Sequence, residues 1–186
     1  PALVEDTPAA IKATVESIRL LESDLLPSDA LVPGDLSNLE VIQRLAWEIR
    51  EFGGRERTLF AIATATSAPM SPASLAEAAN YAARVEAARK ELVLRVDHAD
   101  TPASVRAAVE ALEASYFGSY EATREALLAA AGTGAYGKTL EAFFAESSAA
   151  LATAEAASSE AGDASLTAAT AIRDDATGAL MIALIQ

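Results

Sequence analysis

Apolar residues recur along this chain every three or four positions, which is the spacing of one face of an α-helix. The clearest such stripe runs from about Ser37 to Ser67, a stretch that contains no proline. Ser37 and Glu40 open it with the spacing of a capping box, so a helix start is expected there. The predicted inward positions of this helix are Leu39, Ile42, Ala46, Ile49, Gly53, Glu56, Phe60 and Ala63.

Further stretches show the same period, and turn-forming residues separate them. Thr-Pro pairs at Thr7 and Thr101 predict two helix starts, because threonine caps a helix and proline is tolerated in its first turn. A glycine-rich stretch at 132–137 and the pair Gly162-Asp163 predict two breaks. The expected helices cover about 7–26, 37–67, 74–98, 102–131, 139–159 and 164–186.

Short connections between long helices favour antiparallel neighbours. No sustained alternation of apolar and polar residues predicts a strand. The sequence therefore predicts a single all-α domain over residues 1–186, an antiparallel up-and-down helical bundle of the four-helix type, with six helices of which the central three are long.

The fourth expected helix carries two tyrosines four residues apart, Tyr116 and Tyr120. We interpret them as core residues with hydroxyl groups at the rim, and the alternative is the aromatic wall of a pocket. The predicted inward positions of this helix are Val105, Val109, Leu112, Tyr116, Ser119, Thr123 and Leu127.

Composition narrows the range of functions. The net charge of −13 argues against nucleic acid and anionic membrane surfaces as partners, since each requires a positive face. With no cysteine and a single histidine, His98, the chain is expected to bind neither a metal ion nor a cofactor. His98 is interpreted as a residue at a helix C-terminus, where a cation is favoured. No apolar run of about 18 residues predicts a membrane span.

Residues 132–139, GTGAYGKT, match the phosphate-binding pattern GxxxxGK[ST]. That pattern requires a strand before it, whereas residues 124–131 have a helical composition. We interpret Gly132 as a left-handed helix cap and the following residues as a turn that carries Lys138. A nucleotide-dependent enzyme is the weakest of three hypotheses, and we expect no enzymatic activity, because one histidine supports no catalytic triad.

One face of the helix 37–67 combines an aromatic ring, two guanidinium groups and a gap. Trp47, Arg50, Gly54 and Arg57 follow one another at helical spacing, and Arg44 and Arg55 lie nearby. Guanidinium groups bind carboxylates and oxyanions through paired hydrogen bonds. The alternative is a solvated face on which glutamates pair with the arginines along the helix.

The same helix contains two further anomalies. Gly53 and Gly54 each cost roughly 1 kcal/mol relative to alanine, so a kink, a close approach or a cavity is expected. Glu56 falls on the core stripe, where a carboxylate needs a partner or water. Arg173 on the last helix is a candidate for the opposite side of a site. The predicted ligand-binding residues are Trp47, Arg50, Gly54, Glu56, Arg57 and Arg173.

Residues 53–66, GGRERTLFAIATAT, are similar to the Glu-Arg core of nitrate/nitrite-sensing (NIT-type) helical domains. Arg57 matches the first arginine of that family, Gly54 stands where a glutamine is more usual, and Arg173 is the late arginine. The whole chain resembles the extracytoplasmic helical sensor domains of bacterial chemoreceptors and sensor kinases.

The resemblance implies a periplasmic domain that lies between two transmembrane helices of an inner-membrane receptor. Such a domain forms a homodimer, binds a small molecule such as an anion or organic acid, and signals through its terminal helices. The alternative is a structural or partner-binding helical bundle without a small-molecule ligand.

Overall fold

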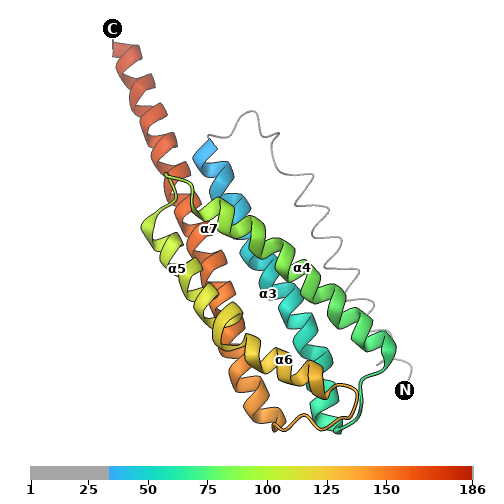
Figure 1. The fold of residues 1–186 in the computed structure, drawn as a ribbon. Helices are drawn as coiled ribbons and strands as arrows, with labels where there is room; N and C mark the ends of the chain where they lie inside the picture. The colour runs from blue at the N-terminus through green and yellow to red at the C-terminus, as the bar shows by residue number, and fades with distance from the viewer. Residues whose placement is uncertain (1–33, 186) are drawn as a thin grey trace, which may run out of the picture. The chain divides into compact units, whose positions relative to one another are not determined.

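The computed structural model of the chain describes residues 34–185, which form helices and loops without a strand (Figure 1). The predicted all-α class is confirmed for these residues. The chain divides into two compact units, Pro1–Ser37 and Asn38–Gln186, and the contacts discussed below lie within the second. The helix predicted over residues 7–26 lies outside the described residues, and a single domain over the whole chain stays a prediction.

Long helices joined by short loops account for nearly all of the described chain. The elements in chain order are α3 (Gly34–Thr66), α4 (Pro72–Val96), α5 (Ala103–Ala114), the π-helical turn η2 (Ser115–Ser119), α6 (Glu121–Ala130) and α7 (Leu140–Ile185). The predicted helices 37–67 and 74–98 thus agree with α3 and α4 to within a few residues.

Helix α4 begins with the cap that its local sequence indicates, whereas α3 begins earlier than its sequence predicted. The Ser71 hydroxyl accepts a hydrogen bond from the backbone N–H of Ser74 at 3.1 Å, and Pro72 occupies the first turn of α4. Such a cap satisfies an amide that has no partner within the helix. By contrast, the predicted capping box is wrong, because α3 already begins at Gly34 and Ser37 lies inside it.

Helix α7 continues through Gly162, so the predicted break at Gly162-Asp163 is wrong. A Cβ atom at Gly162 would lie 2.7 Å from the side-chain nitrogen of Gln43, which belongs to α3. The end of the exposed Gln43 side chain therefore lies directly against Gly162 on the neighbouring helix. Residues 139–159 and 164–186, predicted as two helices, belong to one.

The π-helical turn η2 moves the inward positions by one residue as far as Arg124, and Leu127 is inward as predicted. The backbone N–H of Tyr120 donates to the carbonyl of Ser115 at 2.9 Å, which closes a turn one residue wider than in an α-helix. Tyr120 and Arg124 are consequently buried. The predicted inward positions Ser119 and Thr123 are wrong, since Ser119 is exposed and Thr123 is half-buried.

Helix α3 contacts α7 and α4, and in both pairs the helices run antiparallel. Along α3 and α7, Arg50 contacts Glu155 and Arg57 contacts Ser148, so one residue number rises as the other falls. On the other side, Phe52 of α3 stacks on Tyr81 of α4 with 6.2 Å between ring centroids.

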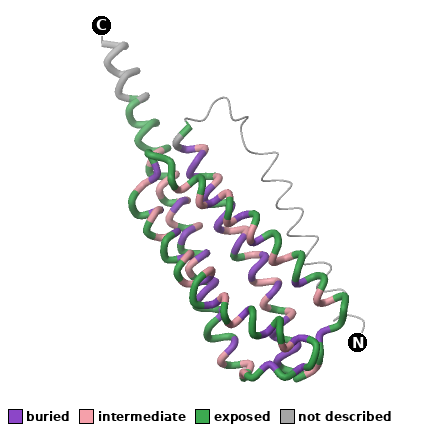
Figure 2. Tube along the Cα trace, viewed as in Figure 1, coloured by how far each residue is buried: buried purple, intermediate pink, exposed green. Residues whose placement is uncertain are grey.

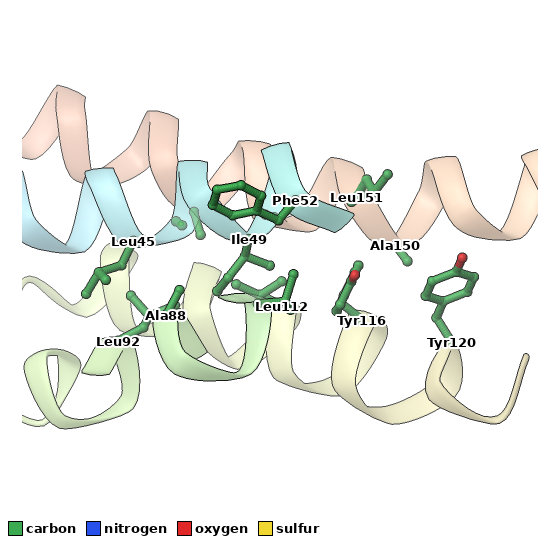
Figure 3. Packing of buried hydrophobic residues seen from close by; sticks show 14 of the residues in the cluster. Leu45, Ile49, Phe52, Ala88, Leu92, Leu112, Tyr116, Tyr120, Ala150 and Leu151 are labelled. Carbon is green, nitrogen blue, oxygen red and sulfur yellow. The ribbon is translucent and has the colours of Figure 1, made fainter. Parts of the chain in front are cut away.

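The core lies along the inward stripe of α3, and every predicted stripe position on that helix is buried (Figure 2). Side chains from the neighbouring helices complete one continuous cluster, part of which Figure 3 shows. Helix α7 contributes mainly alanines, whose small side chains allow neighbouring backbones to approach closely. These buried alanines recur at helical spacing: Ala150, Ala154, Ala157 and Ala161.

Tyr116 and Tyr120 both belong to this core, as predicted. Tyr116 is completely buried, however, so the expectation that its hydroxyl reaches the rim is wrong. That hydroxyl has no hydrogen-bond partner among the described residues. Burial raises the pKa of Tyr116 above its ordinary value, so this tyrosine stays neutral at physiological pH.

Candidate anion-binding groove

An open groove of about 430 Å³ lies between α3 and α7. Helix α3 supplies three arginines, the Glu51 carboxylate and the Thr58 hydroxyl to its lining, and α7 supplies a hydroxyl group, an apolar strip and a carboxylate. Antiparallel packing of the two helices brings these groups together although about a hundred residues separate them in the chain. The lining residues that matter below are Arg50, Glu51, Gly54, Arg55, Arg57, Ser148, Leu151, Ala152 and Glu155.

The helical period of α3 places Arg50, Gly54 and Arg57 on the same face, and the structure brings these three predicted residues together in the groove. Trp47 lies one turn before Arg50, is half-buried, and is not among the lining residues. Arg55 lines the groove as well, although its place on the helix had not marked it as a site residue.

Two of the three arginines already pair with carboxylates. Arg50 Nε lies 3.2 Å from Glu155 Oε2 across the groove, and both side chains are largely exposed. Arg55 pairs with Glu51 one turn earlier on α3, with 2.7 Å between Nη2 and Oε1. The predicted alternative, pairing of glutamates and arginines along the helix, therefore describes Arg55 but not Arg50.

Arg57 differs from both of these residues. Its Nη1 donates to the Ser148 hydroxyl at 3.1 Å, and its guanidinium lies 5.6 Å from the centroid of the Phe144 ring. Its Nε is buried and has no hydrogen-bond partner among the described residues. No carboxylate in the described part of the chain forms an ion pair with Arg57. Arg57 therefore carries the uncompensated positive charge of the groove.

The adjacent glycines have different roles. A Cβ atom at Gly53 would lie 2.5 Å from the Tyr116 hydroxyl oxygen and 2.9 Å from Leu151 Cδ2, so Gly53 permits close packing. A Cβ atom at Gly54 would meet no atom within 4 Å, and Gly54 lines the groove. The two expectations for this pair, a close approach and a cavity, therefore each apply to one glycine.

Glu56 is directed into the core and not into the groove. Its two carboxylate oxygens accept hydrogen bonds from Nε and Nη2 of Arg124, at 2.9 and 3.0 Å. Burial raises the pKa of Glu56, and the hydrogen bonds and charge of Arg124 offset part of that effect. Arg124 also contacts Glu121 on its own helix. The partner that Glu56 required is thus Arg124, which the helical period alone had placed outside the core.

Arg173 does not reach the groove. It is exposed and contacts its neighbour Asp174. It also lies about 27 Å further along α7 than Glu155, at 1.5 Å per residue. The opposite side of the groove, for which Arg173 was the candidate, is formed by Ser148 and Glu155 instead.

The phosphate-loop pattern occurs between two helices, since α6 precedes it and α7 follows. Left-handed backbone occurs at Gly134 and Gly137, with φ of 76° and 65°, so the cap predicted at Gly132 is wrong. A Cβ atom at Gly134 would lie 2.7 Å from the carbonyl oxygen of Ser67. Lys138 donates to the Glu146 carboxylate and is therefore engaged within the fold.

Chemistry elsewhere in the described residues is sparse. His98 is exposed, follows the end of α4, and lies 3.6 Å from Asp100. Within residues 34–185, no three acidic or histidine side chains gather closely enough to hold a metal ion. None of the helices in this range is long and apolar enough to cross a membrane.

Comparison of the chain with protein-family models, curated proteins and solved structures finds no match in any of the three. The resemblance to helical sensor domains consequently stays a hypothesis. Its support comes from the residues themselves, chiefly Arg57 and its place in the groove.

Proposed function

We propose that this chain is a ligand-sensing helical domain whose groove between α3 and α7 binds a small anion. The observation that carries the proposal is Arg57, a guanidinium without a carboxylate partner in the described structure, in the wall of a groove. Most cations of this chain have acidic neighbours available, since acidic residues outnumber basic ones by 27 to 14. An arginine left unpaired in such a chain has donors available to an external anion.

The arrangement of the helices fits this role. We propose that α3, α4, the α5–α6 pair and α7 form an up-and-down four-helix bundle. Helix α7 lines the groove and then continues past Ala161, the last buried residue among those whose side chains the structure describes, beyond the ends of α4 and α5 (Figure 1). An anion that bridges α3 and α7 would stabilise one packing of the two helices over another. The projecting part of α7 would carry that difference away from the groove.

The sensor resemblance supplies the remaining elements of the proposal. The domain would act as a receptor without catalytic activity, outside the cytoplasm, as a homodimer attached to transmembrane segments. Ligand binding would then shift the terminal helices toward or along the membrane. These elements rest on the resemblance, whereas the groove and its charges rest on the geometry.

A structural or partner-binding bundle is the second candidate. Large apolar side chains on the described surface favour it: Leu94 is 75% exposed, Leu166 69% and Ile62 60%. They lie on three different helices, α4, α7 and α3, and single exposed apolar residues are common on protein surfaces. The groove is therefore the more specific feature.

A thermal-shift screen of the whole chain distinguishes the two candidates. The panel contains small inorganic anions and organic acids at constant ionic strength. A sensor gains melting temperature with at least one anion, and Arg57→Ala removes that gain. Lys90→Ala is the matched control, because it deletes one cation from an exposed part of α4. If no anion stabilises the chain, or if both variants respond as the original does, the groove is not a ligand site.

A further inference from the structure

We propose that the ligand of this groove is a small aliphatic monocarboxylate, and that Glu155 occupies part of its place in the unliganded chain. This inference rests on the proposed function, since it concerns the same groove. It adds the chemical class of the ligand and an internal carboxylate that competes with it.

The charge of the groove indicates a monoanion. Arg55 is compensated by Glu51 and Arg50 by Glu155, which leaves the charge of Arg57. The lining as a whole sets three arginines against Glu51 and Glu155, so its net charge is +1 whether or not Glu155 stays on Arg50, and a single negative charge balances it. A dianion such as sulfate would bring excess negative charge into a chain whose net charge is already −13.

The contact between Arg50 and Glu155 indicates a carboxylate. Here a carboxylate from one helix is held in the groove by a guanidinium from the other, at 3.2 Å. An ion pair with both side chains largely exposed contributes little stability, so an incoming carboxylate can replace Glu155 at Arg50. Arg57 lies two turns, about 10.5 Å, further along the same face of α3, so its guanidinium has to swing toward Arg50 before both can hold one carboxylate.

The remaining lining indicates a short aliphatic body. Leu151 and Ala152 of α7 contribute apolar surface, and Gly54 of α3 leaves space where a side chain would stand. The Phe144 ring lies against the Arg57 guanidinium. A carboxylate with a few methylene groups can place its charged end on the arginines and its body on this apolar strip.

Isothermal titration of the whole chain tests the proposal directly. Acetate, propionate and butyrate are compared with nitrate and sulfate at constant ionic strength, on the original chain and on Glu155→Gln. We expect the monocarboxylates to bind in preference to nitrate and sulfate. We expect Glu155→Gln to tighten their binding about two- to fivefold, the range released by one exposed ion pair. The control Glu141→Gln removes an exposed α7 carboxylate outside the groove, and is expected to leave affinity unchanged.

The possible results distinguish a failure of the monocarboxylate ligand class from a failure of the proposed anion-sensing function. Nitrate or sulfate binding that depends on Arg57, without carboxylate binding, overturns the ligand class and leaves the anion-sensing function standing. Carboxylate binding that is equally affected by Glu155→Gln and Glu141→Gln overturns the competing role of Glu155. An absence of binding by all five anions overturns both the ligand class and the proposed function.

Discussion

Gly53 lies directly against the hydroxyl group of Tyr116, with only 2.5 Å between a Cβ atom built on the glycine and the tyrosine oxygen. The next residue, Gly54, has open space in the corresponding position. Two neighbouring glycines on one helix thus mark its two faces, one closely packed and one open to the groove.

Alanine substitution is therefore expected to have opposite effects at these two positions. Gly53→Ala forces Tyr116 or Leu151 to move, and overpacking costs about 1–3 kcal/mol against a helix-propensity gain of roughly 1 kcal/mol. Gly54→Ala keeps the gain without the clash, so the chain should become up to about 1 kcal/mol more stable. Urea denaturation followed by circular dichroism measures the free energy of unfolding of both variants. Equal changes in stability would contradict the description of Gly53 as closely packed and of Gly54 as open to the groove.

The buried pair of Glu56 and Arg124 gives a second prediction. Arg124→Ala leaves a carboxylate in the core without its guanidinium, which should destabilise the chain by roughly 3–5 kcal/mol. Arg95→Ala breaks an exposed pair with Glu91 and should cost at most about 1 kcal/mol. The comparison uses the free energy of unfolding at neutral pH. Similar losses for the two variants would mean that Arg124 is not buried as described.

Much of α3 could be predicted from the sequence, and so could half of the groove. The 3.6-residue period identified both the core stripe and the face of Arg50, Gly54 and Arg57. The opposite half, from Ser148 to Glu155, was not predicted because an alanine-rich helix shows little contrast between its faces. The break predicted at Gly162 was wrong because one glycine costs a long helix only about 1 kcal/mol, and α7 continues through it.

Arg124 could not be assigned to the core by periodicity. A single π-helical turn adds one residue, and the inward positions move from Ser119 to Tyr120 and from Thr123 to Arg124, whereas Leu127 stays inward. A prediction from the average helical period of 3.6 residues cannot show such a shift. The requirement of the buried Glu56 for a partner was the one signal in the sequence, and it did not specify which cation would meet it.

The π-helical turn leads to a third prediction. Gly118 lies in the turn and is exposed, so deleting it should convert η2 to regular α-helix while Tyr120 and Arg124 keep their inward direction. Deleting the exposed Ala126 instead rotates Leu127 away from the core. We expect the first deletion to reduce the melting temperature clearly less than the second. The reverse order would contradict the described phase shift.

The contact between Lys138 and Glu146 gives a prediction about pH. The hydrogen bonds from Lys138 and from the Thr123 hydroxyl lower the pKa of Glu146 below its ordinary value. A carboxyl group with a lowered pKa in the folded state stabilises the fold at neutral pH, and this contribution disappears as pH falls through the folded-state pKa.

Melting temperatures of the original chain and of Lys138→Met test this prediction between pH 7 and pH 2. The difference between the two proteins should be largest at neutral pH and should shrink below about pH 4.3, the ordinary pKa of glutamic acid. A difference that stays constant over the whole range would show that the lysine acts through packing instead of charge.

The central claim is that a small anion binds in the groove between α3 and α7, and filling the groove tests it most directly. Gly54→Leu places a large side chain in open space, so the variant should fold with a melting temperature close to that of the original chain. The measurement is isothermal titration of the stabilising anion into both proteins. We predict that the original chain binds and that Gly54→Leu does not. Equal binding by the two proteins would contradict the account, because the anion would then bind elsewhere.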